Sequence, residues 1–403
     1  MTDSGCDTLP VLIAGGGIAG LTLALTLAKH GRRAIVLEAR PRWSEAGAGI
    51  QLGPNATRIL GRLGVASRLA RYAVTPDAIT IMEAHEGATL IRLPLGLDIA
   101  QRYAAPYWVT HRADLLHALL NASREETLIS LKAGFRVESI STTDSNVTAV
   151  SSSSERAVGT VLVGADGIWS RLCRFVQPDA RRAYSGLVAA RAIVPIGAVP
   201  DAINRRGTSV WLAPRVHLVS YPVHAGNSIA VVAVLPAQEP TAGWRNAIDQ
   251  EDLKQRIGRV CRPLRALLAL QSDWRQWGLY DPTPLRQWSR GATILIGDAA
   301  HPILPFLAQG GAMAIEDAYV LGHMLVQQSG PLAQTLEKFE RERRPRVAKV
   351  QRASRENGRV YHLGGVAASA RNFALRRLPA EWAMRRYDWI YNWQWGPDDA
   401  QQH

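Results

Sequence analysis

The first forty residues consist of short apolar runs separated by glycine turns. Four apolar residues at 11–14 precede a glycine-rich turn, and an apolar stretch of helical length follows at 21–30. Gly31 ends that stretch, and a second apolar run occupies 33–39. A strand, a turn, a helix and a second strand in this order are typical of a βαβ unit. The pattern therefore predicts a parallel sheet at the start of the chain.

Later apolar runs fall into two types. Segments 160–167 and 292–300 are continuous apolar runs that end in a turn, which indicates buried parallel strands. Three other runs are broken by Gly, Pro and Asn and predict an antiparallel sheet, namely 187–196, 209–223 and 227–236. Helical patterns cover 54–71, 111–123, 250–270 and the region from 333 onward, where Pro345 marks a kink or a junction.

The two strand types are interleaved along the chain, which indicates two interwoven domains. A chain of 403 residues is also longer than one ordinary domain. We expect one domain on the parallel sheet, a second domain on the antiparallel sheet and a helical segment at the end. The first domain comprises 1–75, 101–180 and 280–340, the second comprises 76–100 and 181–279, and the helical segment is 341–403.

Composition and charge limit the setting in which the protein works. The formal net charge is +13, but the basic residues are spread out and the densest run, 338–346, also carries acids, so we expect no nucleic-acid partner. Cys6, Cys173 and Cys261 form no CxxC pair, which favours a reducing, cytoplasmic setting and no metal site. We find no signal-peptide pattern and no apolar stretch near the ~20 residues of a membrane span, and we expect no integral membrane segment.

A glycine motif joins the first strand to the first helix. Gly15, Gly17 and Gly20 follow the G-x-G-x-x-G spacing, and Glu38 ends the second strand. Such glycines let a pyrophosphate approach a helix N-terminus, and the acid accepts hydrogen bonds from ribose hydroxyls. Glycines that serve only close packing are the alternative. The motif indicates a dinucleotide and leaves FAD and NAD both open.

Further motifs give the chain a family resemblance. Asp166-Gly167 ends the run at 160–167, and Gly297-Asp298 lies in the run at 292–300. With the glycine motif, in this order and at these distances, they make the chain similar to the single-component flavoprotein aromatic hydroxylases over nearly its whole length. Local segments resemble the salicylate, 3-hydroxybenzoate and 6-hydroxynicotinate hydroxylase branch, namely 45–60, 109–120, 280–288, 297–318, 357–363 and 387–391.

The resemblance implies an FAD-dependent monooxygenase of α/β fold. A Rossmann-like FAD-binding domain, built on the parallel sheet, would be interwoven with an antiparallel-sheet substrate domain and followed by the C-terminal helical segment. NADH or NADPH would reduce FAD as a transient co-substrate, and O2 would then form a C4a-hydroperoxide that hydroxylates a small phenolic or carboxylated aromatic or heteroaromatic substrate. The resemblance allows a homodimer.

The resemblance also assigns residues to FAD. Asp298 would bind ribityl or ribose hydroxyls from the end of its strand. Gly310, Gly311 and Ala312 would offer amides to the N1–C2=O edge of the flavin from a helix N-terminus, whose dipole stabilises the negative charge of reduced flavin. The other implied contacts, near the flavin and at the pyrophosphate turn, are Arg112, Gln51 and Asp166. An ordinary surface or loop role is the alternative for Arg112 and Gln51.

The substrate side depends on one apolar run. A period of two over 211–221 places Trp211, His217 and Tyr221 on one face of a single strand. A phenol has a pKa of about 10, and a histidine that accepts its proton pushes electron density into the ring near neutral pH. His217 is therefore the candidate base and Tyr221 the candidate orienting residue. A histidine bonded to a carbonyl is the alternative.

The loop after Gly297-Asp298 departs from the relatives. Relatives that act on 3-hydroxybenzoate or 6-hydroxynicotinate carry Gln or His at two positions where this chain has Pro305 and Phe306. These two residues can shape a substrate pocket but exchange no proton. His301 in the same loop is expected to be structural.

Three other functions remain as alternatives. The basic charge and the aromatic tail allow a quinone-precursor hydroxylase or an epoxidase of the same fold that acts at a membrane surface. A non-enzymatic redox-sensing partner has only the scattered cysteines and the charge in its favour. A plain NAD-dependent dehydrogenase would not need a second Gly-Asp site on a late strand.

Overall fold

The computed structural model describes residues 9–43, 48–143, 146–238, 246–271, 273–281 and 283–396. The strands in this part of the chain are β1 Val11–Ala14, β2 Ala34–Glu38, β3 Gly49–Leu52, β4 Ala78–Glu83, β5 Thr89–Pro94, β6 Trp108–His111, β7 Ile129–Ala133, β8 Val137–Thr142, β9 Val147–Ser151, β10 Arg156–Gly159, β11 Val161–Gly164, β12 Tyr184–Pro195, β13 Thr208–Ala213, β14 Val216–Val223, β15 Ser228–Pro236, β16 Asn246–Ile248, β17 Trp274–Tyr280, β18 Ser289–Arg290 and β19 Thr293–Leu295.

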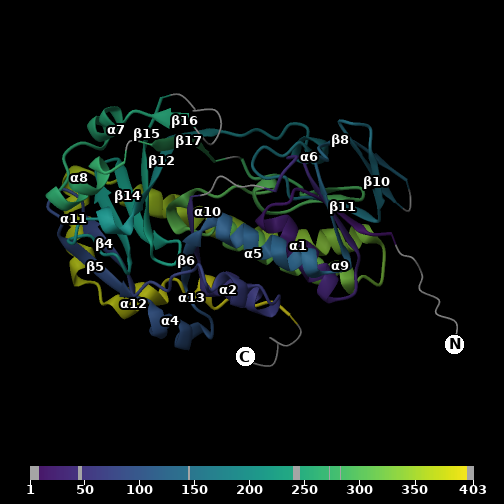
Figure 1. Ribbon diagram of the computed structural model, residues 1–403, viewed down its shortest axis with the longest axis horizontal. Helices are drawn as coiled ribbons and strands as arrows, with labels where there is room; N and C mark the ends of the chain where they lie inside the picture. The colour runs from purple at the N-terminus through teal and green to yellow at the C-terminus, as the bar shows by residue number, and fades with distance from the viewer. Residues whose placement is uncertain are drawn as a thin grey trace.

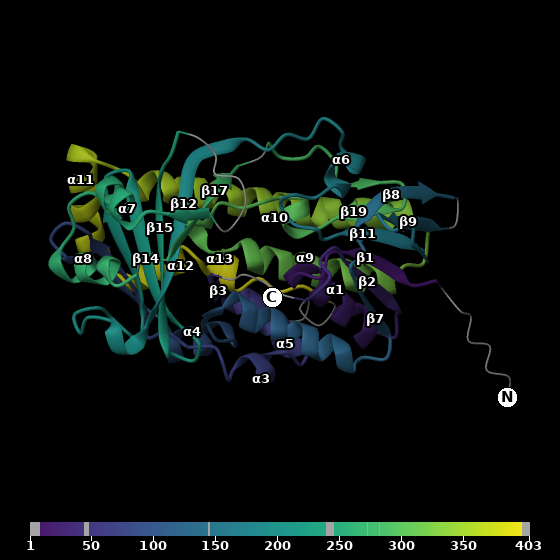
Figure 2. The same cartoon turned by 45° about the horizontal axis from the view of Figure 1, so that its top comes forward.

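The α-helices are α1 Ile18–Lys29, α2 Pro54–Arg62, α3 Ala66–Leu69, α4 Gly96–Tyr103, α5 Arg112–Glu125, α6 Leu172–Val176, α7 Gln250–Ile257, α8 Arg262–Ala269, α9 Gly310–Val326, α10 Leu332–Tyr361, α11 Gly365–Arg377, α12 Ala380–Arg385 and α13 Asp388–Tyr391. Three short 3-10 helices are η1 Ile196–Ala198, η2 Gly297–Ala299 and η3 Pro305–Leu307. The two large sheets lie at opposite ends of an elongated molecule, and α10 extends from one towards the other (Figures 1 and 2).

The six-stranded sheet confirms the predicted βαβ unit. Its strand order is β18-β19-β11-β1-β2-β7, and all neighbours except β18 and β19 run parallel. Every residue of β1 and β11 is buried, because helices cover this kind of sheet and its strands are apolar on both faces. Helix α1 packs against α5 and α9. Because β11 and β19 pair in parallel, the runs at 160–167 and 292–300 lie next to each other as buried parallel strands.

The eight-stranded sheet has the order β16-β17-β12-β15-β14-β13-β4-β5. Its pairs are antiparallel except β13 with β4, which run parallel. The run 209–223, expected as one strand, is a hairpin of β13 and β14 with Pro214 and Arg215 at the turn. Arg215 has a φ of +64°, which few non-glycine residues adopt. This reversal changes which side chains share a face.

Helix boundaries differ from the expectation at three places. The pattern at 54–71 forms two helices, α2 and α3, with Gly64 at a φ of +73° between them. The pattern at 250–270 also divides, into α7 and α8, with Gly258 at a φ of +80° after α7. Pro345 lies inside α10, which continues through it over 30 residues. The expected junction at Pro345 is therefore wrong.

The described helices include none that combines the length and the apolar character of a membrane span. Cys173 and Cys261 are buried free thiols, and Cys6 lies outside the described residues. The domain boundaries given above remain a prediction.

Candidate functional site

A cavity of about 1,100 Å³ lies between the two sheets. Its lining comes from both: the turns after β1, β2, β11 and β19 on one side, and the faces of β12, β14, β15 and β17 on the other. Cavities that bind small molecules usually measure about 300–1,000 Å³. The volume therefore suits a large cofactor together with a small second ligand.

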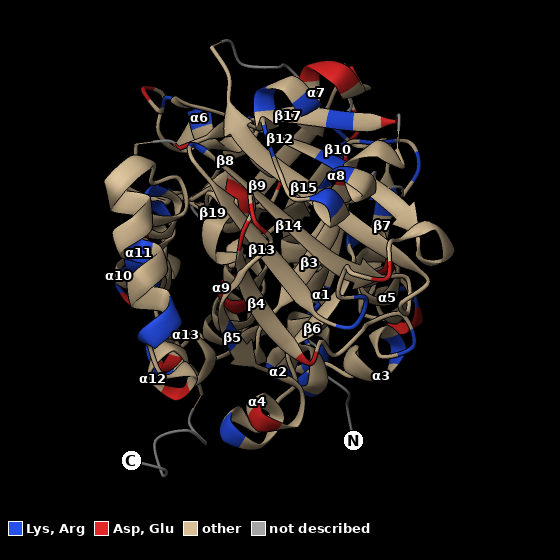
Figure 3. Cartoon of the chain, turned by 90° about the vertical axis from the view of Figure 1, so that its left-hand side faces the viewer, with Lys and Arg blue, Asp and Glu red and all other residues tan. Residues whose placement is uncertain are grey.

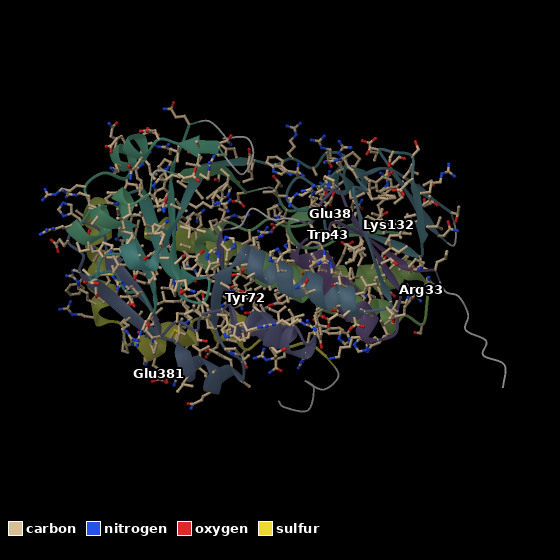
Figure 4. The ribbon with its side chains drawn as sticks, viewed as in Figure 1. Arg33, Glu38, Trp43, Tyr72, Lys132 and Glu381 are labelled. Carbon is tan, nitrogen blue, oxygen red and sulfur yellow. The ribbon has the colours of Figure 1, made fainter. Side chains whose placement is uncertain are left out.

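The glycine turn after β1 forms one end of the cavity. Gly15, Gly17 and Glu38, which ends β2, line it, and so does Trp43. Figure 4 labels Glu38 and Trp43. Oε2 of Glu38 accepts a hydrogen bond from the amide of Gly16 at 2.8 Å, which fixes the carboxylate at the turn. Gly20 is not part of the lining, and a Cβ there would come within 1.9 Å of the Gly15 oxygen. Gly20 therefore serves close packing of α1 rather than cofactor contact.

Asp298 and the start of α9 form another wall. Asp298 in η2 lines the cavity, and so do Gly310 and Gly311 in the first turn of α9. No side chain caps that turn, so its amides suit an anionic or electron-rich group. Ala312 is fully buried and does not reach the cavity. Its side chain therefore belongs to the core, and the expected contact of its amide with the flavin edge stays a prediction.

Gln51, Arg112 and Asp166 all line the cavity. Tyr107 donates a hydrogen bond from its hydroxyl to Oε1 of Gln51 at 2.7 Å, which fixes the Gln51 side chain. Oδ2 of Asp166 accepts a hydrogen bond from the amide of Arg171 at 2.9 Å. Burial raises the pKa of Asp166 against the opposing effect of its hydrogen bonds. The structure thus brings together three residues that lie 61 and 54 positions apart in the sequence.

These walls fit the FAD that the resemblance implies. The other carboxylate oxygen of Asp166 is buried and bonds to no described residue, so a ligand group can satisfy it. A Cβ at Gly17 or Gly310 would meet nothing within 4 Å, which leaves open space at the start of α1 and of α9. Glu38 would hold ribose hydroxyls, the α1 turn the pyrophosphate, Asp298 further hydroxyls, and the α9 amides the flavin edge.

Gly17→Ala tests this arrangement without disturbing the apoprotein. The added methyl group fits the structure, because nothing lies within 4 Å of it and Gly17 has a φ of −84°. It would occupy the space of the pyrophosphate, and we expect FAD to bind at least about tenfold more weakly. Fluorescence titration of the apoprotein with FAD measures this loss. Gly61→Ala, also in open space but remote from the cavity, is the control; equal affinity of the two variants would contradict the placement.

The face of the eight-stranded sheet forms the floor of the cavity. His217, Val219 and Tyr221 alternate along β14 and all line it. Two rows of Cα partners run from β14 through β15 to β12. They are His217–Val234–Ala189 and Val219–Val232–Arg191. Figure 3 shows β14 and β15 free of charged residues. Arg191 therefore brings a cation to an otherwise uncharged floor.

Arg191 is a site residue that the sequence analysis missed. Its guanidinium lies 5.2 Å from the ring centroid of Trp277, which also lines the cavity. An Arg within an apolar strand run was the available signal, because an interior charge without a function is costly. Its charge makes this part of the floor suitable for an anion.

His217 is buried, with 2% of its surface exposed. Its Nδ1 lies 2.9 Å from Nε2 of His362, the residue that follows α10. The rings of Phe306 and Tyr361 lie 5.4 and 5.3 Å from the His217 ring. Burial lowers the pKa of His217, and His362 lowers it further, to about 3. The imidazole is therefore neutral near pH 7, and in the tautomer that donates from Nδ1 to His362 its Nε2 is the nitrogen that can accept a proton.

Two expected pocket residues lie elsewhere. Trp211 is buried in the cluster on the other face of the sheet, where it pairs with Leu218 across the hairpin. Phe306 does not line the cavity; it packs in a small core cluster and against the two imidazoles. Both pocket predictions are wrong. Pro305 does line the cavity.

A buried ionic network supports the loop around Asp298. Asp317 accepts hydrogen bonds from the Gly297 amide at 3.0 Å and from Nε of Arg343 at 2.8 Å, and its Oδ2 lies 2.5 Å from Nε2 of His301. Arg343 also donates to Glu316 at 2.8 Å. His301 is thus structural, as its context indicated. The rest of this network was not predicted from the sequence, where its signal was a pair of adjacent acids, Glu316 and Asp317, in the apolar helix α9.

One cluster outside the cavity could hold a cation. Single ligand atoms of His111, Asp114 and His224 lie within 4.8 Å of one another. Nδ1 of His111 already accepts a hydrogen bond from the Ala113 amide at 3.3 Å as the N-cap of α5. Helix capping therefore accounts for His111 without an ion.

Comparisons with known proteins give a consistent result. A family model described as "FAD binding domain" matches residues 8–354. The chain is 35% identical over 396 residues to 3-hydroxybenzoate 6-hydroxylase of Polaromonas naphthalenivorans (strain CJ2), with 98% of each chain covered. It is 34% identical over 394 residues to 3-amino-4-hydroxybenzoate 2-monooxygenase of Streptomyces cremeus, with 97% of this chain and 96% of the relative covered.

Two solved structures share the fold. One is a salicylate hydroxylase in a substrate complex, with a TM-score of 0.81, 24% identity and 97% of each chain covered. The other is Klebsiella pneumoniae HpxO with FAD and uric acid, with a TM-score of 0.83, 23% identity, and 94% of this chain and 95% of the other covered. The cavity described above therefore belongs to a fold that has been solved with FAD.

Proposed function

We propose that this chain, which belongs to the FAD binding domain family of flavin-dependent aromatic hydroxylases, acts on a small phenol that carries a carboxylate. The chain is an FAD-dependent monooxygenase that uses NAD(P)H and hydroxylates an aromatic compound. The resemblance expected from its motifs is thereby confirmed. The names of both relatives specify hydroxybenzoates, which carry a phenol and a carboxylate, and this supports the proposed substrate.

The positions of Arg191 and His217 on one face of the sheet are the observation that carries this substrate class. Their strands, β12 and β14, are separated only by β15, so the two backbones lie about 10 Å apart. Their side chains enter the same cavity. A guanidinium binds a carboxylate through paired, charge-assisted hydrogen bonds. An aromatic ring with a carboxylate at one end and a hydroxyl at the other suits the space between them.

The chain's own residues bind the substrate, orient it and accept its proton. FAD, when bound, supplies the oxygen-transfer chemistry. Arg191 would hold the carboxylate, and Nε2 of the neutral His217 would accept the phenol proton, which raises electron density in the ring. Burial raises the pKa of Tyr221. Its hydroxyl therefore stays protonated and would orient the substrate by a hydrogen bond.

A panel of ring acids tests the proposed substrate class. The panel comprises 3-hydroxybenzoate, 4-hydroxybenzoate, salicylate, 3-amino-4-hydroxybenzoate and 6-hydroxynicotinate, each beside a neutral analogue in which a hydroxymethyl group replaces the carboxylate. We expect at least one acid to shift the flavin spectrum and to accelerate NADH or NADPH consumption with formation of a hydroxylated product. If only neutral compounds do so, the proposed substrate class is wrong.

Arg191→Leu gives a direct test of the carboxylate contact. Loss of a charge-assisted hydrogen-bonded pair costs about 1.5–3 kcal/mol, so we expect KM for the carboxylated substrate to rise about 10- to 100-fold. KM for the neutral analogue should change little. Arg275→Leu is the matched control, because Arg275 of β17 is the Cα partner of Arg191 in the neighbouring β12 but does not line the cavity. Equal effects on the acid and on its neutral analogue would exclude the contact.

Three further properties belong to this proposal. The oxidant is O2, as hydroxylation with NAD(P)H requires. A cytoplasmic setting is supported by the demand for NAD(P)H and by the free thiols of the two described cysteines, Cys173 and Cys261. A homodimer is the proposed assembly, and gel filtration with light scattering tests it.

The alternative of a quinone-precursor hydroxylase or an epoxidase at a membrane surface predicts binding to anionic liposomes, which a flotation assay measures.

A further inference from the structure

His217 and His362 form a pair of imidazoles that leads out of the cavity. Nδ1 of His217 and Nε2 of His362 lie 2.9 Å apart, and the ring centroids lie 5.1 Å apart. His217 lines the cavity and is buried, whereas His362 does not line it and is half-buried. Nε2 of His217 bonds to no described residue, so the two nitrogens of this ring face different partners. The pair thus connects the cavity with a half-buried residue at the end of α10.

Aromatic rings enclose this pair. Phe306 lies 5.4 Å from the His217 ring and 5.6 Å from the His362 ring, and Tyr361 lies 5.3 Å from His217. Gly358 of α10 permits this packing, because a Cβ there would come within 2.7 Å of the Phe306 ring. Pro305 and Phe306 carry no side-chain group that exchanges a proton, whereas His362 lies within hydrogen-bond distance of His217.

We propose that His362 is a positioning residue that relays the substrate proton from His217 towards solvent, an inference that rests on the proposed function of His217 as base. The substrate O–H bond breaks as an N–H bond forms at Nε2 of His217. The proton on Nδ1 of His217 passes to Nε2 of His362, and Nδ1 of His362 releases its own proton to water. The reverse path returns a proton when the product oxygen is reprotonated, which restores both tautomers within one turnover.

The location of His362 favours it as the residue that bears the positive charge. It follows the C-terminus of α10, where the helix dipole stabilises a cation. Burial lowers the pKa of His362 to about 4, less than burial and His362 together lower that of His217, to about 3. His217 is buried and His362 is half-buried, so a positive charge costs less on His362 than on His217.

Other groups around His362 act on this charge. Tyr361, the preceding residue on α10, stays protonated, because burial raises its pKa. Arg215, at the turn between β13 and β14, is a neighbour of His362. Its amide donates a hydrogen bond to the main-chain oxygen of His362 at 3.0 Å. From α11, the Arg371 guanidinium donates to the oxygens of Val360 and Tyr361 at 2.9 and 3.0 Å. Burial is the cause of the lowered pKa of His362, so a proton that it receives passes on to solvent rather than staying.

His362→Gln and His362→Ala test the relay in the FAD-loaded enzyme, with 3-hydroxybenzoate and 3-amino-4-hydroxybenzoate as probes. Glutamine keeps a hydrogen-bonding group beside His217 but transfers no proton. We expect kcat to fall about tenfold in both variants, the solvent isotope effect on kcat to increase, and the Kd of the probe, from the flavin spectrum, to stay unchanged. Added imidazole should restore the rate of His362→Ala in proportion to its concentration.

His323→Gln is the matched control, because His323 is also partly buried with a pKa lowered to about 4, but lies outside the cavity. It should leave kcat and the isotope effect unchanged. If His362→Gln keeps the wild-type rate and isotope effect while His217→Gln slows turnover, the relay is wrong and the base assignment stands. If His217→Gln leaves turnover unchanged, the base assignment itself fails. A slower His362→Ala that imidazole does not restore would reduce His362 to a packing role.

Discussion

Replacement of His217 by glutamine is expected to lower kcat by about 10²- to 10⁴-fold, the usual contribution of a general base. FAD should stay bound, because the cofactor walls come from the parallel sheet and α9, whereas His217 lies on β14. Glutamine retains a polar group beside His362 and removes only the proton acceptor. Stopped-flow measurement of flavin reduction and reoxidation, with the yellow chromophore as a check on loading, gives the rate.

The pH dependence of kcat/KM separates the base role from a structural one. Burial lowers the pKa of His217 to about 3, so the free enzyme keeps a neutral base well below the ordinary histidine pKa of about 6.5. Activity should therefore show no loss near pH 6.5 that belongs to this group, and should fall only as the pH approaches the lowered values of the His217–His362 pair. This acid limb should disappear in His217→Gln. An identical profile in both proteins would remove His217 from the base role.

Stability provides an independent check on the same group. A histidine whose pKa is lower in the folded state than in the unfolded chain binds more protons when unfolded. The stability that it contributes is therefore present above pH 6.5 and decreases as the pH falls from about 6.5 towards 3. Urea denaturation at pH 7 and pH 5 should show a smaller loss for His217→Gln than for the wild type.

The cofactor side of the site was largely predictable, because it depends on local sequence. The G-x-G-x-x-G turn, the acid at the end of β2, Asp166 and Asp298 each follow a buried parallel strand, and parallel strands place their carboxyl ends at one edge of the sheet. Gly20 and Ala312 were assigned to the cofactor by their motifs, but packing determines their positions. A motif shows which turn is present, and the side that each residue faces depends on the tertiary contacts.

The substrate side was less predictable, because one turn reverses it. Pro214 and Arg215 interrupt 209–223 without the Gly or Asn that usually marks a hairpin. In an unbroken strand Trp211 and His217 would lie on the same face of the sheet, whereas the hairpin places Trp211 on the other face. His217 and Tyr221 still share a face, because both belong to β14. His362 lies 145 residues from His217, and no spacing rule relates the two.

The ionic network below Asp298 leads to the second large effect, that of Arg343→Met. Arg343 has 1% of its surface exposed and donates to Asp317 and Glu316 at 2.8 Å each. Burial opposes its charge, but the two carboxylates outweigh burial and raise its pKa. Without Arg343, Asp317 keeps His301 and the Gly297 amide and Glu316 keeps Arg346, but the broken buried ion pair typically costs about 3–5 kcal/mol. We expect the free energy of unfolding to fall by about this amount, measured by urea denaturation at pH 7.

The same substitution should weaken FAD binding, because Asp317 also holds the amide of Gly297, next to Asp298. Arg341→Met is the control on the same helix, since Arg341 is exposed and its loss should change stability by less than about 0.5 kcal/mol. Asp317→Asn combined with Arg343→Met should cost less than the sum of the two single changes, because the double variant buries less unpaired charge. Additive costs, or an Arg343→Met variant as stable as Arg341→Met, would show that the network does not support the Asp298 turn.

The decrease in the free energy of unfolding at acid pH follows from the same charges. Burial raises the pKa of Asp317, but His301 and Arg343 outweigh burial and hold it well below the ordinary value of 3.8. A carboxyl whose pKa is lower in the folded state contributes stability that is fully present above pH 3.8 and is lost as the pH falls below it. Without Arg343 that pKa rises, so Arg343→Met has less of this stability to lose on acidification. The difference between wild type and Arg343→Met should therefore be largest at neutral pH and should narrow below pH 4, because protonation of Asp317 removes the charge that Arg343 compensates.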